Sequence, residues 1–454
     1  MARKRGGKLR FGCREIEALL RAVARGEEIK PFQVAKREVF QQFGIVGTDY
    51  DRVFTAIIYK FFRARGLVDK IVAKVTNLDP EKIEDLLTRT ALRLGTYLRV
   101  LDEVKDENLL EAFHRCVREL IDPSYRQLFD AVWRALEGFE YVPSTRDEEL
   151  ELRYLVPSYL VKLLRQVVEN EKELEELLNA LNTPLPLGFR VNTLKSSIDR
   201  VVRKLRRLGV DAWPSERVPN HVRYMGGVDY TKLDLLRNGE VVPQDEPSAL
   251  AAILLDPRPG ELIVDLCAAP GGKTTHLAEL SRNRATIIAF DIFIDRMERL
   301  KEMAMRTGTY QSILPMLADA RYASRILGEE VADKVLLDPP CSSTGVLFKH
   351  PDARWKLTPE RLLDTVMLQR ALLEEAHRIL KPGGKLLYTT CSLLYAENEG
   401  NIKWFLSKHP CYEIVPLKGP YEESRFLPGA MRAWPHRHGV SGFFYVLLEK
   451  VYRC

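Results

Sequence analysis

The apolar and polar positions of the chain follow a helical pattern at the front and an alternating pattern toward the end. Up to about residue 140, apolar residues recur at helical spacing, as in residues 15–24, 53–63 and 68–75. Asp79 and Pro80 are residue types that cap and begin a helix, and no strand-like alternation intrudes. This pattern predicts an all-helical domain.

A polar, proline-containing stretch over residues 140–149 marks the first expected boundary. After it, residues 154–164 have helical spacing, and this helix is expected to continue into the acidic residues 169–178. Acidic residues in a row usually form the solvent-facing side of a helix. The second part of the chain is therefore expected to begin with a helix.

Strand and helix patterns then follow each other closely. Residues 188–195 are β-prone, and a helix is expected over residues 196–209, with Ser196 and Asp199 as a start that resembles a capping box. Residues 218–224 are again β-prone. The order of strand, helix and strand predicts a small ferredoxin-like α+β unit.

From residue 239 onward, β-prone and helical segments alternate. The expected strands are residues 262–266, 286–291, 313–319, 334–338, 385–390, 412–416 and 442–449. This order predicts a doubly wound, Rossmann-like α/β sheet with an antiparallel end. The expected domains are therefore 1–145 (all-helical), 146–238 (small α+β) and 239–454 (α/β).

The composition is that of a globular protein. Of the 454 residues, 46% are hydrophobic and 29% are charged, and no apolar run approaches the roughly 20 residues of a membrane span. The basic residues at the start of the chain are not followed by the apolar segment of a secretory signal. We therefore expect a cytoplasmic protein that has no contact with a membrane.

The net charge of +6 permits an acidic partner without requiring one, so local charge is more informative. Five cations gather on the helix expected over residues 196–209. They are Arg200, Arg203, Lys204, Arg206 and Arg207. Such a cluster is either a solvated helix face or a surface that contacts phosphates.

The seven cysteines include no Cys-x-x-Cys pair, which argues against a disulfide framework and against a zinc site. No metal is therefore expected, and a functional cysteine is expected to act as a thiol. Cys341 and Cys391 each follow an expected strand, and Cys267 lies in a glycine loop. A thiol at a strand end near cationic groups is readily activated as a nucleophilic thiolate.

Residues 262–276 have the order strand, glycine loop and helix. The strand ends in Asp265, and Gly271 and Gly272 lie in the loop, where the absence of side chains is expected to let a ligand approach the backbone. Loops of this kind bind nucleotide-like ligands at the carboxyl edge of α/β sheets. The spacing is neither Gly-x-Gly-x-x-Gly nor that of a Walker loop, which disfavours a dinucleotide or ATP.

Acidic residues stand at the ends of three further expected strands. Asp291 is placed to accept hydrogen bonds from ribose hydroxyls, and Asp319 to hold an adenine amino group. Asp338 ends the next strand. A single aspartate of this kind is usually a cap or a turn former, but a series along one edge predicts a nucleoside site. S-adenosylmethionine fits this edge better than NAD or ATP.

Short motifs surround the glycine loop and the two cysteines. They include Gln244-Asp245-x-x-Ser248, Asp265-Leu-Cys-Ala-Ala-Pro-Gly-Gly-Lys-Thr-Thr275, Asp338-Pro-Pro-Cys341, Thr390-Cys-Ser392, Glu397-Asn-Glu399 and Pro435-His-x-His438. With these motifs, residues 239–450 closely resemble the RNA cytosine-C5 methyltransferases of the Fmu/Sun (RsmB-like) family. The helical front is similar to the NusB-like RNA-binding extension of its ribosomal-RNA members. The resemblance implies a class I S-adenosylmethionine-dependent methyltransferase sheet.

The resemblance also implies catalytic roles. Cys391 is similar to the nucleophile that adds to C6 of cytosine, and Cys341 to the second cysteine, which is needed to remove the C5 proton and release the product. Asp338 would hydrogen-bond the cytosine amino group, and Lys273 would assist at the base. The residues implied to hold S-adenosylmethionine are Cys267, Ala268, Ala269, Pro270, Gly271, Gly272, Lys273, Asp291, Arg296, Asp319 and Asp338.

RNA is the partner that this resemblance implies, with ribosomal RNA favoured over transfer RNA by the NusB-like front. The target cytosine would have to leave its stack, and the protein is expected to be a monomer. Two alternatives are weaker. An adenine or glutamine N-methyltransferase would have an aromatic residue at position 341, and an RNA-binding assembly factor would have no need of both cysteines.

The chain departs from the family pattern at two places. Ser343 stands where the family usually has glycine, and Tyr395-Ala396 where Pro-Glu is common. The serine is expected to leave its loop slightly more crowded. Neither departure is expected to touch a catalytic group.

Overall fold

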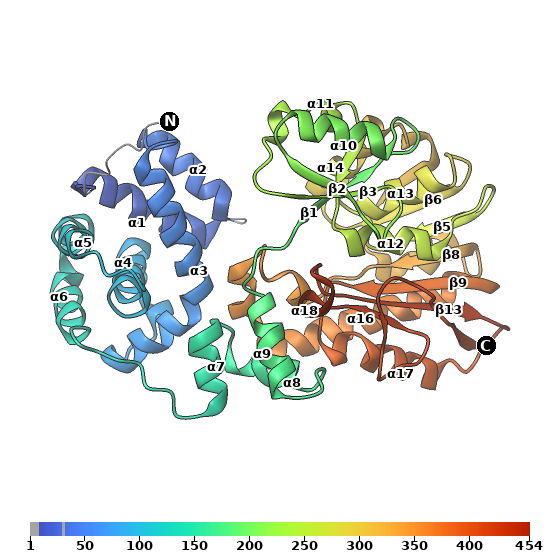
Figure 1. Cartoon of the computed structure of the whole chain (residues 1–454). Helices are drawn as coiled ribbons and strands as arrows, with labels where there is room; N and C mark the ends of the chain where they lie inside the picture. Colours follow the sequence, from blue (N-terminus) through green and yellow to red (C-terminus); the bar gives the residue numbers. More distant parts are fainter. Residues whose placement is uncertain (1–8, 30–31) are drawn as a thin grey trace. The chain divides into compact units, whose positions relative to one another are not determined.

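The computed structural model describes residues 9–29 and 32–454. The chain divides into two compact units (Figure 1). One consists of Met1–Val161 together with His350–Lys356, and the other of Lys162–Lys349 and Leu357–Cys454. The expected division into three domains at residues 145 and 238 stays a prediction.

The first unit is helical, as the apolar spacing predicts. Its helices are α1 (Cys13–Glu28), α2 (Phe32–Gln42), α3 (Asp49–Thr76), α4 (Leu86–Thr96), α5 (Glu107–Leu120), α6 (Arg126–Ala135) and α7 (Arg146–Tyr154). Its core is rich in aromatic side chains, among them Phe54, Phe61 and Phe113, which are fully buried. A buried arginine, Arg93, lies beside this core and is paired with partly buried acids. The guanidinium of Arg93 donates to Asp69 at 2.6 Å and to Glu27 at 2.8 Å.

Two details of this unit differ from the expectation. The two helices expected before and after Gly66 are one continuous helix, α3. Asp79 caps only a 3₁₀ turn over Pro80–Lys82, and the longer helix begins later, after Asp85 accepts a hydrogen bond from the Thr88 amide at 2.7 Å. The Asp-Pro pair and Asp85 offer competing caps, and the sequence pattern does not decide between them.

Gly66 makes room for a distant part of the chain. A 3₁₀ segment, Pro351–Lys356, belongs to the helical unit, and within it the indole of Trp355 packs on α3. The indole nitrogen of Trp355 donates to the Arg63 carbonyl at 2.7 Å. A Cβ atom on Gly66 would overlap the indole ring. The glycine is therefore required by close packing rather than by its backbone angles.

The second unit contains a small antiparallel sheet. Its strands are β1 (Leu187–Val191), β2 (Asp211–Pro214), β3 (His221–Met225) and β4 (Val241–Pro243), in the order β2-β3-β1-β4. Because β4 pairs with β1, this sheet extends beyond residue 238. Helix α10 (Ile198–Arg207) follows Ser197 rather than Ser196, without a side-chain cap. The expected long helix is two helices, α8 (Ser158–Arg165) and α9 (Glu171–Ala180), separated at Asn170.

The large sheet of this unit has the expected doubly wound order with an antiparallel end. Within the described residues the order is β11-β12-β13-β9-β8-β5-β6-β7, with β10 paired to β13. Strands β5 to β9 are parallel neighbours, and β13 is antiparallel to β9. Their bounds are β5 (Leu262–Asp265), β6 (Thr286–Asp291), β7 (Ile313–Leu317), β8 (Ala332–Leu337), β9 (Leu380–Thr390), β10 (Tyr412–Val415), β11 (Glu422–Glu423), β12 (Met431–Ala433) and β13 (Phe443–Lys450).

Helices cover both faces of this sheet (Figure 1). They are α12 (Glu246–Leu255), α13 (Gly272–Leu280), α14 (Ile294–Thr307), α15 (Ala323–Leu327), α16 (Pro359–Ile379) and α17 (Glu399–Lys408). The short helix α11 (Asp234–Arg237) packs on the small sheet, and α18 (Pro435–His438) packs against α9. Ile263 and Leu387 pack with α12, α13 and α14, whereas their neighbours Val264 and Leu386 pack with α15, α16 and α17. Consecutive strand residues therefore fill two separate cores, as the alternation of side chains along a strand requires.

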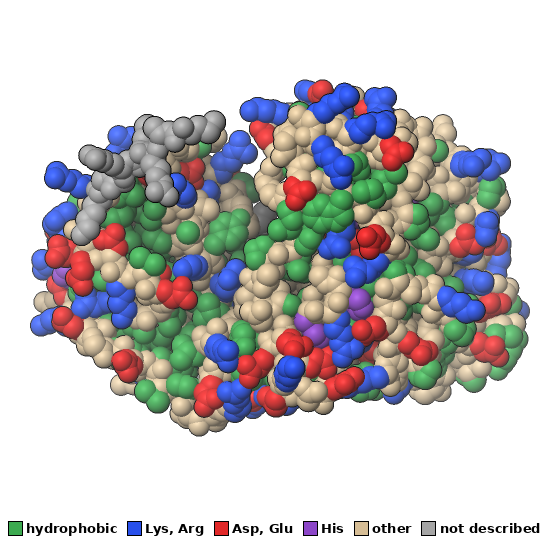
Figure 2. All heavy atoms as spheres, viewed as in Figure 1, with side chains coloured by type: hydrophobic (Ala, Val, Ile, Leu, Met, Phe, Trp, Pro, Cys, Tyr) green, Lys and Arg blue, Asp and Glu red, His purple; other side chains and the backbone are tan. Residues whose placement is uncertain are grey.

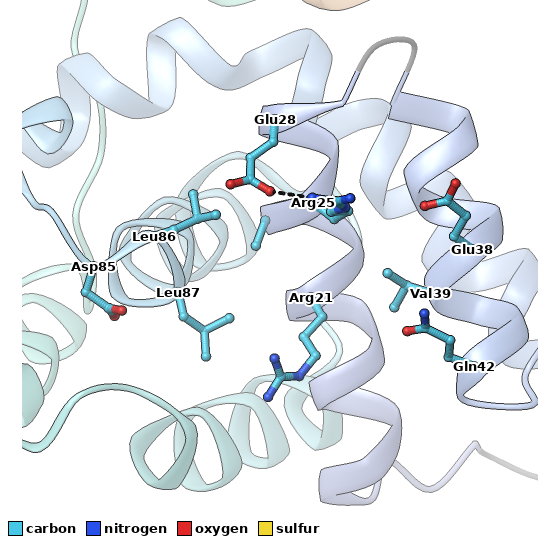
Figure 3. Close-up of a pocket in the computed structure, with 10 residues that line it drawn as sticks. Arg21, Arg25, Glu28, Glu38, Val39, Gln42, Asp85, Leu86 and Leu87 are labelled. Atoms are coloured by element: carbon cyan, nitrogen blue, oxygen red, sulfur yellow. Dashed lines mark hydrogen bonds and ion pairs between the residues drawn. The ribbon is translucent and has the colours of Figure 1, made fainter.

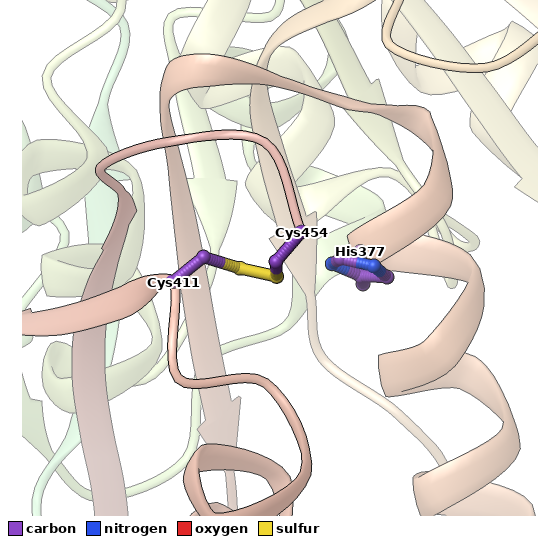
Figure 4. Close-up of side chains that lie close together, drawn as sticks. All are labelled: His377, Cys411 and Cys454. Carbon is purple, nitrogen blue, oxygen red and sulfur yellow. A yellow bond between two sulfur atoms is a disulfide. The ribbon is translucent and has the colours of Figure 1, made fainter.

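The expectation that the cysteines are unpaired is wrong for two pairs. The structure contains the disulfides Cys13–Cys116 and Cys411–Cys454, whose partners are 103 and 43 residues apart in the sequence. Figure 4 shows His377 beside the second disulfide. The side chains of His377, Cys411 and Cys454 lie close enough to share a metal ion, but the two sulfur atoms are bonded to each other in the disulfide. The fold brings these cysteines together over long separations, so their spacing carried no signal. Along residues 9–29 and 32–454, no helix combines the length and the apolarity needed to cross a membrane.

We predict that Gly66→Ala destabilises the helical unit by about 1–3 kcal/mol, because the added methyl group overpacks the Trp355 site. In a Trp355→Ala background the same substitution should instead stabilise by about 0.5–1 kcal/mol, the usual gain from glycine to alanine within a helix. Thermal unfolding of the four variants of the intact chain measures this change of sign. An equal effect of Gly66→Ala in both backgrounds would contradict the packing role.

Candidate active site at the carboxyl edge of the large sheet

A cavity of about 560 Å³ opens where β5, β6, β7, β8 and β9 end. Its volume lies within the range of small-molecule sites, roughly 300–1,000 Å³. Residues that the sequence predicts at the site and that line this cavity are Cys267, Ala269, Asp291, Arg296, Asp319, Asp338, Cys341 and Cys391. Parallel strands end at one edge of a sheet, so residues up to 124 positions apart meet here.

The remaining residues of the predicted glycine loop do not line the cavity. They are Ala268, Pro270, Gly271, Gly272 and Lys273. Gly271 has a left-handed backbone with φ of 103° and lies against Leu300 of α14, where a Cβ atom would be 3.1 Å from the Leu300 Cγ. Its role is therefore to turn the chain tightly into α13, rather than to clear the ligand's path as we expected.

The carboxyl group of Asp265 is hydrogen-bonded to both ends of this loop. It is buried and accepts a hydrogen bond from Thr274 Oγ1 at 2.8 Å. Burial raises the pKa of Asp265 to about 7, with the nearby Asp338 carboxylate adding to the rise. The hydroxyl group and the glycine loop thus hold a carboxyl group that titrates near neutral pH directly behind the cavity.

Acidic and basic groups face each other at one end of the cavity. Asp291 is buried and accepts from the Phe293 amide at 3.0 Å, while its other oxygen lies 3.5 Å from the Arg296 guanidinium. Arg296 also donates to the Ala269 carbonyl, which ties the glycine loop to α14. Asp319 forms an ion pair with Arg321, and hydrogen bonds from that guanidinium lower the pKa of the Asp319 carboxyl.

The sequence reasoning missed the apolar walls of this end. Ile292, Phe293 and Leu368 line the cavity, and the side chain of Phe293 is exposed. Ile292 and Phe293 could have been predicted, because they directly follow Asp291 and therefore lie at the same edge of the sheet. Leu368 comes from α16, far away in the sequence, and no motif marked it.

The two predicted cysteines face each other at the cavity wall. Their sulfur atoms are 3.4 Å apart. The hydrogen bond from the Cys341 thiol lowers the pKa of Cys391 and raises the pKa of Cys341 well above its ordinary value. Of the two, Cys391 is therefore the thiol prepared to ionise. Burial keeps the pKa of Cys267 well above its ordinary value, so this third thiol is not activated.

Lys273 lies behind the reactive end rather than in the cavity. Its ammonium group donates to Asp338 Oδ2 at 2.5 Å and lies 5.3 Å from the Phe443 ring. Burial acts to lower the pKa of Lys273, but the Asp338 carboxylate outweighs it and raises that pKa above its ordinary value. Lys273 therefore stays protonated and orients Asp338 toward the two cysteines.

A buried carboxylate that the sequence reasoning quoted without a role, Glu397, joins the loops that carry the cysteines. It accepts from the Ser342 amide at 2.8 Å and from the hydroxyl groups of Ser342 and Ser392. Gln369 of α16 donates to it at 3.1 Å. Because Ser342 follows Cys341 and Ser392 follows Cys391, one carboxylate fixes both sulfur positions.

The expectation that Ser343 touches no catalytic group is wrong. Its hydroxyl oxygen lies 3.7 Å from Cys391 Sγ, and the residue lines the cavity. Tyr395 lies outside the cavity and packs edge-on against Phe426, so the second departure from the family pattern does not reach the site.

Two features lie apart from the cavity. The exposed cations of α10 include Arg203 and Arg207, and Figure 2 shows Lys and Arg side chains gathered over α10 and α11. A hollow of about 430 Å³ in the helical unit lies between α1, α2 and the start of α4 (Figure 3). Its lining includes an exposed ion pair between Arg25 and Glu28, and it contains no residue of the predicted site.

Comparison with known families gives a consistent result. Residues 252–449 match the model of the 16S rRNA methyltransferase RsmB/F family. Residues 156–231 match the ferredoxin-like domain of RsmF/B-like methyltransferases. The ribosomal RNA small subunit methyltransferase B of Serratia proteamaculans is 32% identical over 329 residues, which cover 72% of this chain and 74% of that protein. The protein of the same name from Escherichia coli is 33% identical over the same share.

Solved structures agree with this assignment. The structure named PH0851 is 41% identical, with a TM-score of 0.86 over 98% of this chain and 100% of that one. A methyltransferase homolog protein from Pyrococcus horikoshii is 30% identical, with a TM-score of 0.59 over 68% of this chain and 100% of its own. NSun6 from the same organism, solved with SFG, is 24% identical at a TM-score of 0.60 and shares the fold.

We predict that Glu397→Gln destabilises the second unit by about 1–3 kcal/mol, because an amide NH₂ would face the hydroxyl donors that the carboxylate now accepts. The same variant should slow alkylation of Cys391, since the two cysteine loops lose their common anchor. Thermal unfolding and peptide mapping after iodoacetamide treatment measure the two effects. Glu413→Gln, an exposed change on β10, is the matched control, and an equal response of both variants would contradict the anchoring role.

Proposed function

The chain belongs to the RsmB/F family of ribosomal RNA methyltransferases, and from this premise we propose that it methylates C5 of a cytosine in ribosomal RNA. The methyl donor is S-adenosylmethionine, and the reaction passes through a covalent bond between Cys391 and C6 of the base. The observation that carries the proposal is the pair of cysteine sulfurs 3.4 Å apart, facing the same cavity as the strand-end acids. Because ribosomal RNA is found in ribosomes, the proposed substrate favours a cytoplasmic location for the enzyme.

The cavity fits the proposed methyl donor. Asp291 offers a buried carboxylate for ribose hydroxyls, and Phe293 and Leu368 offer apolar contacts for a flat base. Asp319 and Arg296 line the cavity as well. The loop from Cys267 to Lys273 is the proposed cradle of the methionine part, which it would contact through Cys267 and Ala269, the two loop residues that line the cavity. S-adenosylmethionine supplies the electrophilic methyl group when it is bound. NSun6 from Pyrococcus horikoshii, which shares the fold, has been solved with SFG.

Cys391 begins the chemistry that this chain's residues perform. Its thiolate adds to C6 of the cytosine, and the electron pair of the C5–C6 double bond moves into the ring and makes C5 nucleophilic. The neighbouring Cys341 thiol supports the ionised form of Cys391. An unactivated pyrimidine carbon would not accept a methyl group, so this addition must come first.

Asp338 positions the base and stabilises its charge. It lines the cavity beside both cysteines, and the buried ammonium of Lys273 holds it in place at 2.5 Å. In this orientation it is placed to accept a hydrogen bond from the cytosine amino group. A fixed polar partner of this kind stabilises charge that develops on the ring during the addition.

Cys341 serves the release of the product. Once C5 carries the methyl group, its remaining proton must leave so that the electron pair can re-form the double bond and expel Cys391 from C6. Cys341 is the proposed acceptor of this proton, with its sulfur 3.4 Å from that of Cys391. It acts as a thiolate: once Cys391 is bonded to C6, Cys391 no longer raises the pKa of Cys341, which releases its own proton to solvent before it takes the one from C5. Without it, the adduct should accumulate.

The substrate must present an unstacked base, because the cysteines lie inside a cavity. Single-stranded loops and bulges of RNA offer such bases. The exposed cations of α10 are a proposed surface for the RNA backbone, which would make binding weaken with salt. The NusB-like front is proposed to bind RNA as well, and the protein is proposed to act as a monomer.

We predict different outcomes for three proteins that are given methyl-labelled S-adenosylmethionine and unmodified ribosomal RNA. Wild type should form 5-methylcytidine, Cys341→Ala should form a covalent protein–RNA band on a denaturing gel, and Cys391→Ala should do neither. Cys411→Ser, whose sulfur lies outside the cavity, is the control for the loss of any one cysteine and should still form product.

Two results would contradict the proposal in different ways. Undiminished methylation by Cys391→Ala would exclude the covalent mechanism. Label that enters transfer RNA but not ribosomal RNA would keep the chemistry and overturn the substrate.

We also predict that Asp291→Asn weakens binding of S-adenosylmethionine by roughly tenfold or more, because a charge-assisted hydrogen bond contributes about 1.5–3 kcal/mol. Titration calorimetry without RNA measures the affinity. Asp295→Asn, an exposed change on α14 outside the cavity, should bind as wild type does. Wild-type affinity in Asp291→Asn would remove this residue from the cofactor site.

A further inference from the structure

Ser343 has a backbone conformation that favours glycine. Its φ is 56° and its ψ is 27°, in the left-handed region. An ordinary L-residue in this region is disfavoured by roughly 1–2 kcal/mol because its Cβ approaches the neighbouring carbonyl oxygen. Strain of this kind persists where the surroundings fix the conformation, and it gathers at functional sites. The position therefore calls for a reason to keep a side chain.

The loop around Ser343 is fixed directly to the strand end that carries the nucleophile. The Gly345 amide donates to the Cys391 carbonyl at 2.9 Å, and the Leu393 amide donates to Thr344 Oγ1 at 2.9 Å. Gly345 has no space for a side chain, because a Cβ atom would overlap the Gly442 carbonyl. The loop consequently cannot shift to relieve the strain at Ser343.

The side chain of Ser343 points at the reactive sulfur. Its hydroxyl oxygen is 3.7 Å from Cys391 Sγ, within hydrogen-bonding distance for sulfur, and it lines the same cavity. When Cys391 is a thiol, it donates to this oxygen. When Cys391 is a thiolate, the hydroxyl group can turn and donate to the sulfur, so one side chain serves both states.

We propose that Ser343 is a positioning residue whose hydroxyl group holds Cys391 in its ionised, attacking state. It acts as a second hydrogen-bond donor to the sulfur, in addition to the Cys341 thiol at 3.4 Å. A hydrogen bond to the charged form of a group favours that form. The inference rests on the proposed role of Cys391 and adds a residue that assists it.

This second donor matters at one particular stage of the reaction. Cys341 gives its hydrogen bond to Cys391 only while it keeps its own proton, and it is also the proposed acceptor of the C5 proton. When the C6–sulfur bond breaks and Cys391 leaves, Cys341 begins as the thiolate that accepts the C5 proton, and it has no proton to donate until that transfer is complete. Ser343 would then still stabilise the departing thiolate, because its hydroxyl group takes no part in the proton balance.

Two substitutions separate the hydroxyl group from the backbone strain. Ser343→Ala removes the hydroxyl and keeps the left-handed backbone, whereas Ser343→Gly removes both the hydroxyl and the strain. Both should raise the pKa of Cys391, and a rise of one unit should slow its alkylation about threefold below that pKa, since the thiolate fraction falls tenfold while nucleophilicity rises. At pH values above the pKa of all three proteins the order should reverse, with both variants alkylated about threefold faster than wild type, because their fully ionised thiolates are more nucleophilic.

The measurement is alkylation of Cys391 in the intact protein from pH 6 to pH 10 with iodoacetamide, resolved by peptide mapping. Thermal unfolding of the same proteins is the second readout. The proposal expects Ser343→Gly to unfold at a higher temperature than Ser343→Ala, while both show the same shifted alkylation profile. A profile that coincides with wild type in both variants would overturn the proposal. A shift in Ser343→Gly alone would also overturn it, because relief of the backbone strain rather than loss of the hydroxyl group would then be responsible.

The assay needs neither RNA nor methyl donor, so it stands apart from the proposed function. A shifted alkylation profile in a protein that methylates no RNA would support the role of Ser343 and count against the function. Methylation by wild type together with unshifted profiles would do the reverse. In a protein that methylates, product formation by both variants should fall with the same pH dependence as alkylation.

Discussion

The hydrogen bonds of the Glu397 carboxylate determine the arrangement on which the rest of the site depends. Cys341 and Cys391 stand on loops that follow different strands, β8 and β9, and strand pairing alone fixes the backbone only as far as each strand end. Beyond that point the loops need another constraint. Glu397 provides it by accepting from Ser342 and Ser392, the residues directly after the two cysteines.

A pair of opposite charges lies beside the two cysteines, Cys341 and Cys391. The two cysteine sulfurs lie at the cavity, while the full charges of Lys273 and Asp338 compensate each other beside them. A buried ion pair costs desolvation and is weak evidence for stability. Here its value is orientation, since an aspartate held by a fixed ammonium group keeps its second oxygen available for a ligand.

Much of the fold and of the site could be read from the sequence, for identifiable reasons. Asp291, Asp338, Cys341 and Cys391 each follow a strand with a clear β pattern, and parallel strands share their carboxyl edge, so local signals placed distant residues together. The disulfides and the Trp355–Gly66 contact could not be predicted in this way. They depend on where segments meet after folding, and neither spacing nor residue type contains that information.

The glycine loop shows a different limit. Residue type alone suggested that Gly271 clears space for a ligand, whereas its left-handed backbone and its contact with Leu300 serve the turn into α13. At Ser343 the error ran the other way, since a residue expected only to crowd its loop reaches the nucleophile. In both cases the backbone angle, which the sequence does not show, decides the role.

The division of the chain has a consequence for anyone who wishes to dissect it. The helical unit is discontinuous, because His350–Lys356 belongs to it although nearly two hundred residues of the other unit intervene. A fragment that stops at residue 161 would lack Trp355 and leave an open notch on α3 at Gly66. A fragment that starts at residue 162 would contain Trp355 but lack α3, on which its indole ring packs. Because the helical unit takes residues from both sides of the segment Lys162–Lys349, one cut in the chain cannot separate the two units.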